Sequence, residues 1–282
     1  MRLRLDVAYD GTDFHGWARQ PSLRTVQGTL EAALGQALRV PPLPVTCAGR
    51  TDTGVHARGQ VLHLDVDPEA LLASAGRSTA PPVEALLRRL NGILPVDVRV
   101  RTAREAPPGF DARFSALWRR YVYRIADAPA LVDPLRRRHV LAWRRPLDEQ
   151  AMNQAAARLV GEHDFAAFCK RREGASTVRR LLELSWSRDA TGCAVATVRA
   201  DAFCHTMVRA LVGCMVAVGE GRRSPEWAEQ VLLRGERDPA VTVVHAHGLT
   251  LEEVAYPPDE ELEARALATR RVRTLSEVSG DG

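Results

Sequence analysis

The chain has 282 residues, of which 45% are hydrophobic, so it is long and apolar enough to bury the core of one large domain or two ordinary ones. Its net charge is +4, and Lys170 is the only lysine among 39 basic residues. No apolar run approaches the length of a membrane span, and the first ten residues, "MRLRLDVAYD", lack the apolar region of a signal peptide. These features exclude membrane and exported classes and make the cytoplasm the expected compartment.

The excess of arginine indicates what kind of binding partner the protein could have. Guanidinium groups hold phosphate through two hydrogen bonds and stack on bases, so a polyanionic partner is compatible with this composition. A solvated basic surface explains the charge equally well.

The cysteines are five in number and include no C-x-x-C pair, so the sequence predicts neither a disulfide framework nor a zinc site. His245 and His247 have no carboxylate or cysteine close to them in sequence, and no metal site is expected there.

The first hundred residues predict strands and helices of one α+β unit. Residues 2–9 alternate apolar and polar side chains, as in a half-buried strand. Residues 25–38 place apolar residues at four-residue steps after Thr25, a suitable N-cap, and predict an amphipathic helix. The other elements expected here are strands at 45–49, 60–67 and 98–102 and a helix at 83–94.

A second unit is expected after the paired prolines of "EAPPGFDARF", residues 105–114, which continue neither neighbouring element. Its predicted elements are a strand at 117–125, a helix near 147–160, extended stretches near 180–187 and 193–200, and an apolar helix at about 202–218. The predicted organisation is an N-terminal half at 1–105, a C-terminal half at 106–257, and a charged tail at 258–282 that forms a peripheral helix or is disordered.

The loop "CAGRTDTGVHARGQV", residues 47–61, contains the strongest candidate for chemistry. Asp52 lies between two predicted strands, where a rigid scaffold can hold a reactive group within reach of a substrate. Arg50 and Arg58 would favour the ionised carboxylate. An aspartate that merely caps its own turn, beside solvated arginines, is an equally good interpretation of the loop alone.

Two further groups of residues have both a functional and a structural interpretation. His205 and Arg209 are four residues apart and would share a helical face, with Arg209 either facing an anion such as Asp52 or reaching solvent at the helix edge. Tyr121 and Tyr123 alternate with arginines along a strand, an arrangement that suits unstacked bases but is also common at the edge of a core.

The segment "CKRREGASTVRR", residues 169–180, is a candidate phosphate-contacting loop, although a solvated charged loop explains it nearly as well. Its possible RNA contacts are Lys170, Arg171, Arg172 and Arg179, in addition to Arg58 and His205 elsewhere.

Five stretches together resemble the tRNA pseudouridine synthase A family. They occur in the family's order and span most of the chain, and the loop containing "GRTD" is the most specific of them. The five stretches are "AYDGTDFHGWARQP", "CAGRTDTGVHARGQV", "FDARFSALWRRYVYRI", "FCHTMVRALVG" and "AHGLTLEEVAY".

The resemblance implies roles for four residues. Asp52 matches the family's essential aspartate and Arg50 the arginine paired with it, Tyr121 matches the tyrosine that lies against the target base, and Arg209 matches the helix arginine near the carboxylate. The glycines of the Asp52 loop, Gly49, Gly54 and Gly59, are then expected to shape the turn that presents Asp52.

The resemblance also implies an α+β fold of two RRM-like (ferredoxin-like) halves whose antiparallel sheets join across a central RNA-binding cleft. The expected protein is a cytoplasmic homodimer that binds tRNA, requires no cofactor or metal, and isomerises uridine to pseudouridine at positions 38, 39 and 40 of the anticodon stem-loop. Asp52 would act as nucleophile on either the sugar or the uracil ring, and both routes stay open.

Two alternatives differ in class. A glycoside hydrolase needs a second carboxylate at a fixed separation, and none is evident near Asp52. A non-catalytic RNA-binding protein of RRM-like fold explains the charge and the aromatic residues but gives no reason for the "GRTD" loop.

Overall fold

The structure is a computed structural model that describes residues 1–170, 174 and 176–270. The chain forms two compact units, with unit 1 comprising residues 1–117 and 251–270 and unit 2 comprising residues 118–250. Each unit combines a sheet with helices, so the predicted α+β class is confirmed. Within the described ranges, every helix is too short or too polar to span a lipid bilayer.

Unit 1 is built on an antiparallel sheet with the strand order β4-β1-β3-β10, and β2 pairs with β3. Its elements are β1 (Arg2–Tyr9), α1 (Val26–Leu38), β2 (Thr46–Cys47), β3 (His56–Asp65), α2 (Pro68–Ala75), α3 (Pro82–Ile93), β4 (Val98–Glu105), β10 (Leu249–Ala255) and α7 (Leu262–Thr269).

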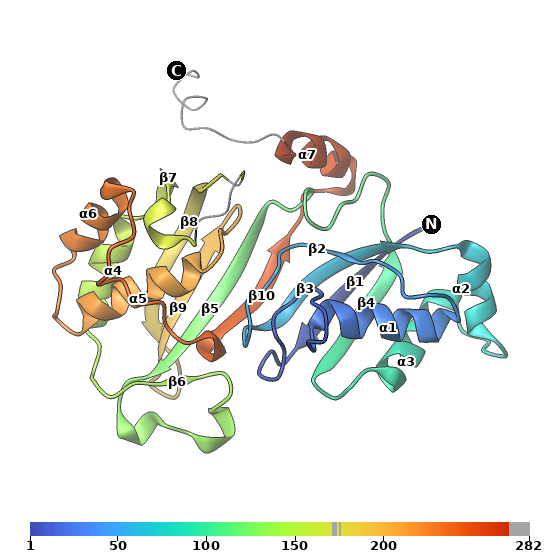
Figure 1. Ribbon diagram of the computed structural model, residues 1–282, viewed down its shortest axis with the longest axis horizontal. Coiled ribbons are helices and arrows are strands. Elements are labelled where there is room, and N and C mark those ends of the chain that lie inside the picture. The colour runs from blue at the N-terminus through green and yellow to red at the C-terminus, as the bar shows by residue number, and fades with distance from the viewer. Residues whose placement is uncertain (171–173, 175, 271–282) are drawn as a thin grey trace. The chain divides into compact units, whose positions relative to one another are not determined.

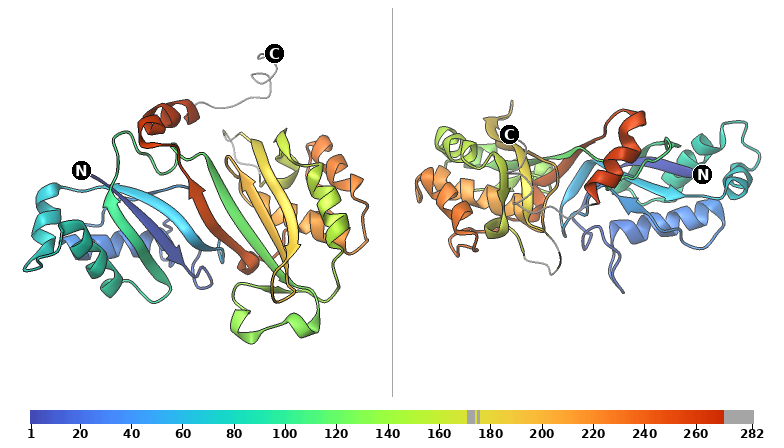
Figure 2. Two further views of the ribbon diagram at one scale, coloured as in Figure 1. Left: turned by 180° about the vertical axis from the view of Figure 1, so that it is seen from behind. Right: turned by 90° about the horizontal axis from the view of Figure 1, so that it is seen from above.

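The core of unit 1 lies between this sheet and helices α1 and α3 (Figures 1 and 2). Strand β1 alternates half-buried and buried residues, with Leu3, Leu5 and Val7 fully buried, as its period of two predicts. Helix α1 begins after Thr25, whose side chain accepts a hydrogen bond from the Gly28 amide, so the predicted N-cap is confirmed.

In unit 2 the strand order is β5-β9-β8-β7 with antiparallel pairing, β6 pairs parallel to β5, and helices α4, α5 and α6 lie together beside these strands (Figure 2). Its elements are β5 (Trp118–Ala126), β6 (Leu141–Ala142), α4 (Glu149–Ala157), β7 (Gly161–Asp164), β8 (Val178–Arg188), β9 (Ala194–Ala200), α5 (Met207–Gly219) and α6 (Glu226–Arg234). Short 3-10 turns lie at 129–131, 134–136, 166–168, 246–248 and 259–261.

The unit boundaries differ from the predicted halves, which meet at 105/106 and end at 257. Residues 106–117 pack within unit 1, where the Ala112 amide donates to His63 Nδ1 at 2.9 Å and the Tyr256 hydroxyl donates to the Ala112 carbonyl at 2.7 Å. Prolines 107 and 108 thus follow the end of β4, but the residues after them still pack within unit 1. The predicted tail contributes α7 to unit 1, with Leu262 and Ala266 buried.

Candidate functional site

Asp52 lies on a tight turn between β2 and β3. The Val55 amide donates to the Asp52 carbonyl at 3.1 Å, which closes a four-residue turn. Gly54 is the third residue of this turn and has a φ of +78°, a conformation that glycine adopts without strain. Asp52 itself is half-buried, so its carboxylate is held by a defined backbone and stays within reach of a ligand.

Residues 14–17 brace this turn from the side. The Trp17 amide donates to the Thr51 carbonyl at 3.0 Å, and the Gly54 amide donates to the Phe14 carbonyl at 3.3 Å. Gly16 lies so close that a Cβ there would come within 3.0 Å of the Thr51 carbonyl oxygen. The backbone of residues 14–17 therefore packs directly against the backbone of Thr51 and of Gly54, on either side of Asp52.

A buried polar network holds the other side of the loop. The hydroxyl groups of Tyr9 and Thr51 share a hydrogen bond of 2.8 Å, and Gln60 Nε2 donates to the Gly49 carbonyl at 2.8 Å and to Tyr9 Oη at 3.3 Å. Burial raises the pKa of Tyr9 well above its usual range, so its hydroxyl keeps its proton. The network ties the loop to β1 and β3.

The three loop glycines perform different tasks, which corrects the prediction that all of them shape the turn. Gly54 alone has a positive φ. Gly59 lies inside β3, where a Cβ would come within 2.2 Å of the Glu252 carbonyl oxygen of β10, so its role is close strand packing. A Cβ at Gly49 would meet open space.

The two arginines predicted beside Asp52 lie in different surroundings. Arg50 is exposed and forms no ion pair with any residue that the structure describes, so the expected pairing of Arg50 with Asp52 is wrong in this structure. Arg58 is exposed as well, and its Nη1 forms an ion pair of 2.8 Å with Glu252. Arg58 is thus partly neutralised within unit 1, whereas Arg50 presents its full charge to solvent.

Tyr121 lies on β5 in unit 2, opposite Val198 of β9. Its side chain is 7% exposed, and its ring meets that of Phe203 edge-on, with centroids 5.2 Å apart. Tyr123, two residues on, is fully buried and donates its hydroxyl hydrogen to the His245 carbonyl at 2.6 Å. Burial raises the pKa of Tyr123, and the Arg209 guanidinium opposes that rise.

The predicted helical face of His205 and Arg209 is wrong. Helix α5 begins at Met207 after Thr206, which has a φ of +68°, so His205 precedes the helix. The left-handed backbone of Thr206 cannot continue an α-helix, and the His205 carbonyl before it accepts a hydrogen bond of 2.9 Å from the Lys170 amide. Arg209 lies in the first turn of α5, and its Nε donates to the Val244 carbonyl at 2.7 Å.

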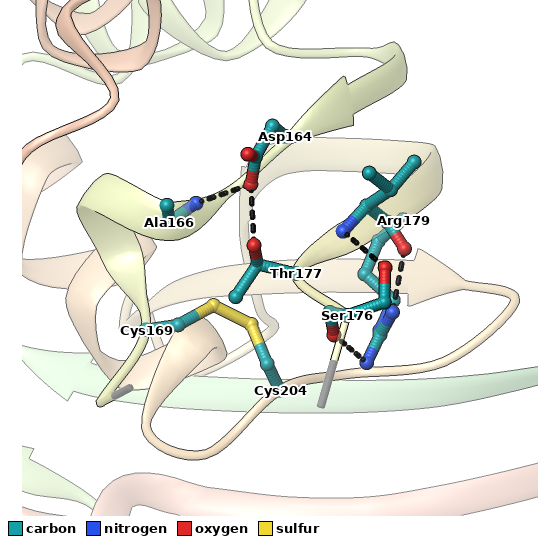
Figure 3. Close-up of a disulfide and its surroundings, with 8 residues drawn as sticks. Asp164, Ala166, Cys169, Ser176, Thr177, Arg179 and Cys204 are labelled. Atoms are coloured by element: carbon teal, nitrogen blue, oxygen red, sulfur yellow. Dashed lines mark hydrogen bonds between the residues drawn. A yellow bond between two sulfur atoms is a disulfide. The ribbon is translucent and has the colours of Figure 1, made fainter. Parts of the chain in front are cut away.

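A disulfide joins Cys169 to Cys204 (Figure 3). The sequence analysis, which predicted no disulfide framework, did not anticipate this cross-link. The two residues are 35 positions apart and their Cα atoms are 5.7 Å apart. No spacing rule pairs them, because the fold alone brings the end of the 166–168 turn to the segment before α5. Cys47, Cys193 and Cys214 are free and buried.

The predicted basic loop is only partly described. Lys170 is exposed, and Arg179 is half-buried with its guanidinium donating to the Ser176 carbonyl at 2.8 Å (Figure 3). Arg171 and Arg172 lie outside the described residues. Where residues are described, no group of three His, Cys, Asp or Glu side chains is arranged to hold a metal ion.

Tyr9, Gly16 and Gln60 were not singled out by the sequence analysis, although they support Asp52. Tyr9 and Gly16 lie in the stretch "AYDGTDFHGWARQP" and Gln60 lies in "CAGRTDTGVHARGQV", so the family resemblance contained a signal for all three. Asp52, Arg50 and Arg58 belong to unit 1, and Tyr121, His205 and Arg209 belong to unit 2.

The chain matches the family model described as tRNA pseudouridine synthase at residues 7–115 and 155–257. These ranges include Asp52 and Arg209 but not Tyr121. A tRNA pseudouridine synthase A from Frankia casuarinae is 60% identical over 280 residues, which are 99% of this chain and 98% of that protein. Proteins of the same name match from Streptomyces griseus (60% identical, 98% of this chain, 95% of that one) and Mycobacterium leprae (50% identical, 97% and 96%).

Proposed function

This chain belongs to the tRNA pseudouridine synthase family, and we propose that it isomerises uridines 38, 39 and 40 of the tRNA anticodon stem-loop with Asp52 as the nucleophile. Membership makes the protein a pseudouridine synthase, an isomerase whose substrate is tRNA. The single observation that carries the role of Asp52 is its place on a turn that is braced on both sides by backbone contacts and by a buried network, yet leaves the carboxylate half-exposed.

The reaction conserves every atom of the nucleotide. The bond between ribose carbon 1′ and uracil nitrogen 1 breaks, the base turns, and carbon 5 bonds to carbon 1′. Carbon 5 loses its proton and nitrogen 1 gains one, so no electrons are transferred and no cofactor is required. Ionised Asp52 acts as the nucleophile on the sugar or on the ring, and its departure restores the carboxylate.

Tyr121 and Arg209 are proposed to serve the same reaction. The Tyr121 ring, seated edge-on against Phe203, would lie against the target base, and its hydroxyl would assist removal of the carbon 5 proton. Arg209 would act as counter-ion to the catalytic carboxylate, and Arg50, exposed in the same loop as Asp52, would bind the substrate. Lys170, His205 and Arg179 would contact the RNA. A stem uridine must leave its helix, which costs a few kcal/mol that contacts to the RNA backbone offset.

We further propose the family's larger organisation for this protein. The strand orders β4-β1-β3-β10 in unit 1 and β5-β9-β8-β7 in unit 2, each accompanied by helices, support a pair of RRM-like halves. The active form would be a cytoplasmic homodimer, because the family resemblance implies one.

The deciding experiment measures tritium release from tRNA labelled at uracil carbon 5. A synthase exchanges that hydrogen with water, so wild-type protein releases tritium, and tRNA variants with cytidine at positions 38, 39 and 40 release none. Binding without release would instead support the alternative, a non-catalytic RNA-binding protein of RRM-like fold. Free uracil in the reaction would indicate glycoside cleavage.

The role of the Tyr121 hydroxyl is tested by Tyr121→Phe, which keeps the ring against Phe203. Turnover should fall by roughly a hundredfold or more while tRNA affinity changes little, since general acid–base groups typically contribute factors of that size. Equal turnover in the variant and the wild type would reduce Tyr121 to a stacking platform. Phe203→Leu is the matched control for lost ring packing.

A further inference from the structure

An open groove lies at the edge of the unit 1 sheet, between helix α3 and the edge strand β4, which lie side by side (Figure 1). Its volume is about 650 Å³. The lining residues are Leu87, Arg88 and Asn91 of α3 and Arg99, Val100 and Arg101 of β4. The groove therefore has three guanidinium groups and no acidic side chain in its lining.

Arg99 and Arg101 lie on the same face of β4, because side chains two residues apart in a strand point the same way. Both are exposed and line the groove, while Val98 before them and Val100 between them are buried. Thr102 is paired with Asp6 of β1 and Val100 with Val7, so the pairing of β4 shifts by one residue at Arg101.

Asn91 fixes the floor of the groove. Its Nδ2 donates to the Val100 carbonyl at 2.8 Å, and its Oδ1 accepts from the Val100 amide at 3.0 Å. The outer edge of β4 is thereby satisfied at Val100, so another strand cannot pair there. The groove is thus a rigid surface and not a site for strand addition.

The charge of the groove is uncompensated. Arg88 donates to Ser78 Oγ at 3.0 Å and Arg99 to the Asn91 carbonyl at 3.4 Å, and both acceptors are neutral. Among the described residues, Arg88, Arg99 and Arg101 form no ion pair, whereas Arg2 and Arg24 in the same unit each pair with an aspartate. Guanidinium groups without acidic partners on two adjoining elements suit phosphate groups.

The groove also lies at the same end of the sheet as the Asp52 loop. Tyr9, at the end of β1, pairs with Ala57 of β3 on one side and with Val98 of β4 on the other. Strand β3 begins four residues after Asp52, and two strand spacings correspond to roughly 10 Å. Residues 10–17, which follow β1, lie between the two, with the Gly54 amide bonded to the Phe14 carbonyl at 3.3 Å and the Asp10 amide to the Asp97 carbonyl at 2.9 Å. An RNA strand at Asp52 would cross this segment to reach the groove.

We propose that the groove of Arg88, Arg99 and Arg101 binds backbone phosphates of the tRNA beside the nucleotide that Asp52 attacks, an inference that rests on the proposed function. The competing explanation is that the arginines only keep the edge strand from pairing with other chains. That explanation predicts aggregation of arginine variants and no change in RNA binding.

The test compares Arg99→Gln/Arg101→Gln with the control Arg77→Gln/Arg144→Gln, which removes two exposed arginines outside the groove. Dissociation constants for full-length tRNA are measured from 50 to 300 mM salt. The groove variant should bind more weakly, and its plot of log affinity against log salt should be shallower by about 1 to 2, because each lost phosphate contact reduces the slope by about 0.9. The control should keep the wild-type slope.

Equal slopes for the groove variant and the wild type would overturn the proposal, as would a control variant that loses as much slope. If the double variant does not fold, Arg88→Gln on the neighbouring helix should still reduce the slope by about 1, and no reduction there counts against the groove. Binding is measured without turnover, so a wild-type protein that binds tRNA but releases no tritium would refute the proposed function and leave the groove result standing.

Discussion

The Asp52 loop and residues 203–209 both present candidate functional side chains, but they are held in different ways. The loop is braced chiefly by backbone atoms, through the bonds to Phe14 and Trp17 and the close approach of Gly16. Residues 203–209 also have backbone bonds, such as that between the Lys170 amide and the His205 carbonyl, but side chains add ties to distant residues through the Phe203 ring, the disulfide of Cys204 and the guanidinium of Arg209. Close packing of backbone against backbone requires glycines and turn residues, which can be recognised in the sequence. Contacts made by side chains produce no such pattern.

The prediction with the largest expected effect tests whether the Asp52 loop serves catalysis. Asp52→Ala should reduce tritium release at least about a thousandfold, because no other group replaces a nucleophile. The free energy of unfolding should change by no more than about 1 kcal/mol, and tRNA affinity should stay the same or rise slightly, since a negative charge is removed. A melting curve, a gel shift and the release assay on one preparation separate these quantities.

Thr53→Ala is the matched control for Asp52→Ala, because Thr53 is the exposed next residue of the same turn. It should leave turnover unchanged. Retained turnover in Asp52→Ala would dismiss Asp52 as the nucleophile, and an unfolded Asp52→Ala protein would show instead that the carboxylate is a structural counter-ion.

The next largest effect concerns the side-chain bracing of residues 203–209. Reducing the disulfide between Cys169 and Cys204, or replacing Cys204 by serine, should lower the free energy of unfolding by about 2 to 4 kcal/mol, the usual range for such a cross-link. Chemical denaturation with and without reductant measures the difference.

Alkylation followed by mass spectrometry is the control for the disulfide. Burial raises the pKa of Cys47 and of Cys214 to about 12, so these thiols stay protonated and unreactive in the folded protein. In denaturant, where every thiol is accessible, the protein should gain three alkyl groups without reductant and five after reduction. Five alkyl groups without reductant would show that the bond does not form.

The backbone bracing of the loop is tested by Gly11→Ala. A Cβ at Gly11 would lie 2.0 Å from the Val55 carbonyl oxygen, so the turn or the strand must shift. We expect a loss of about 1 to 3 kcal/mol in the free energy of unfolding, as for other overpacked sites, together with slower turnover. Gly49→Ala adds the same atom to open space in the same loop, and the two variants should differ clearly in thermal melting.

The smallest effect concerns the buried network beneath the loop. Tyr9→Phe removes the hydroxyl bonded to Thr51 and Gln60 and leaves two buried polar groups with one partner fewer. The expected loss is about 1 to 2 kcal/mol in the free energy of unfolding, measured by urea titration. A stability equal to that of the wild type would mean that backbone contacts alone hold Asp52. Thr46→Val, at an exposed position of β2, controls for loss of a hydroxyl.

The sequence by itself determined the α+β class, most of the longer elements and the identity of the candidate nucleophile. Alternation along β1, the four-residue steps of α1 and the Thr25 cap are local patterns, and local patterns report directly which face of an element is buried. Helices α2 and α6 were missed because their short apolar patterns resemble those of loops.

Tertiary structure alone decided the features that depend on distant residues. The last strand, β10, joins the first sheet, where its approach to Gly59 leaves no room for a side chain. Cys169 meets Cys204, and the Lys170 amide bonds to the His205 carbonyl, while α5 starts at Met207, after the left-handed Thr206, and not at residue 202. Periodicity contains no information about which distant segment supplies a contact, because that choice is made by the packing of the whole unit.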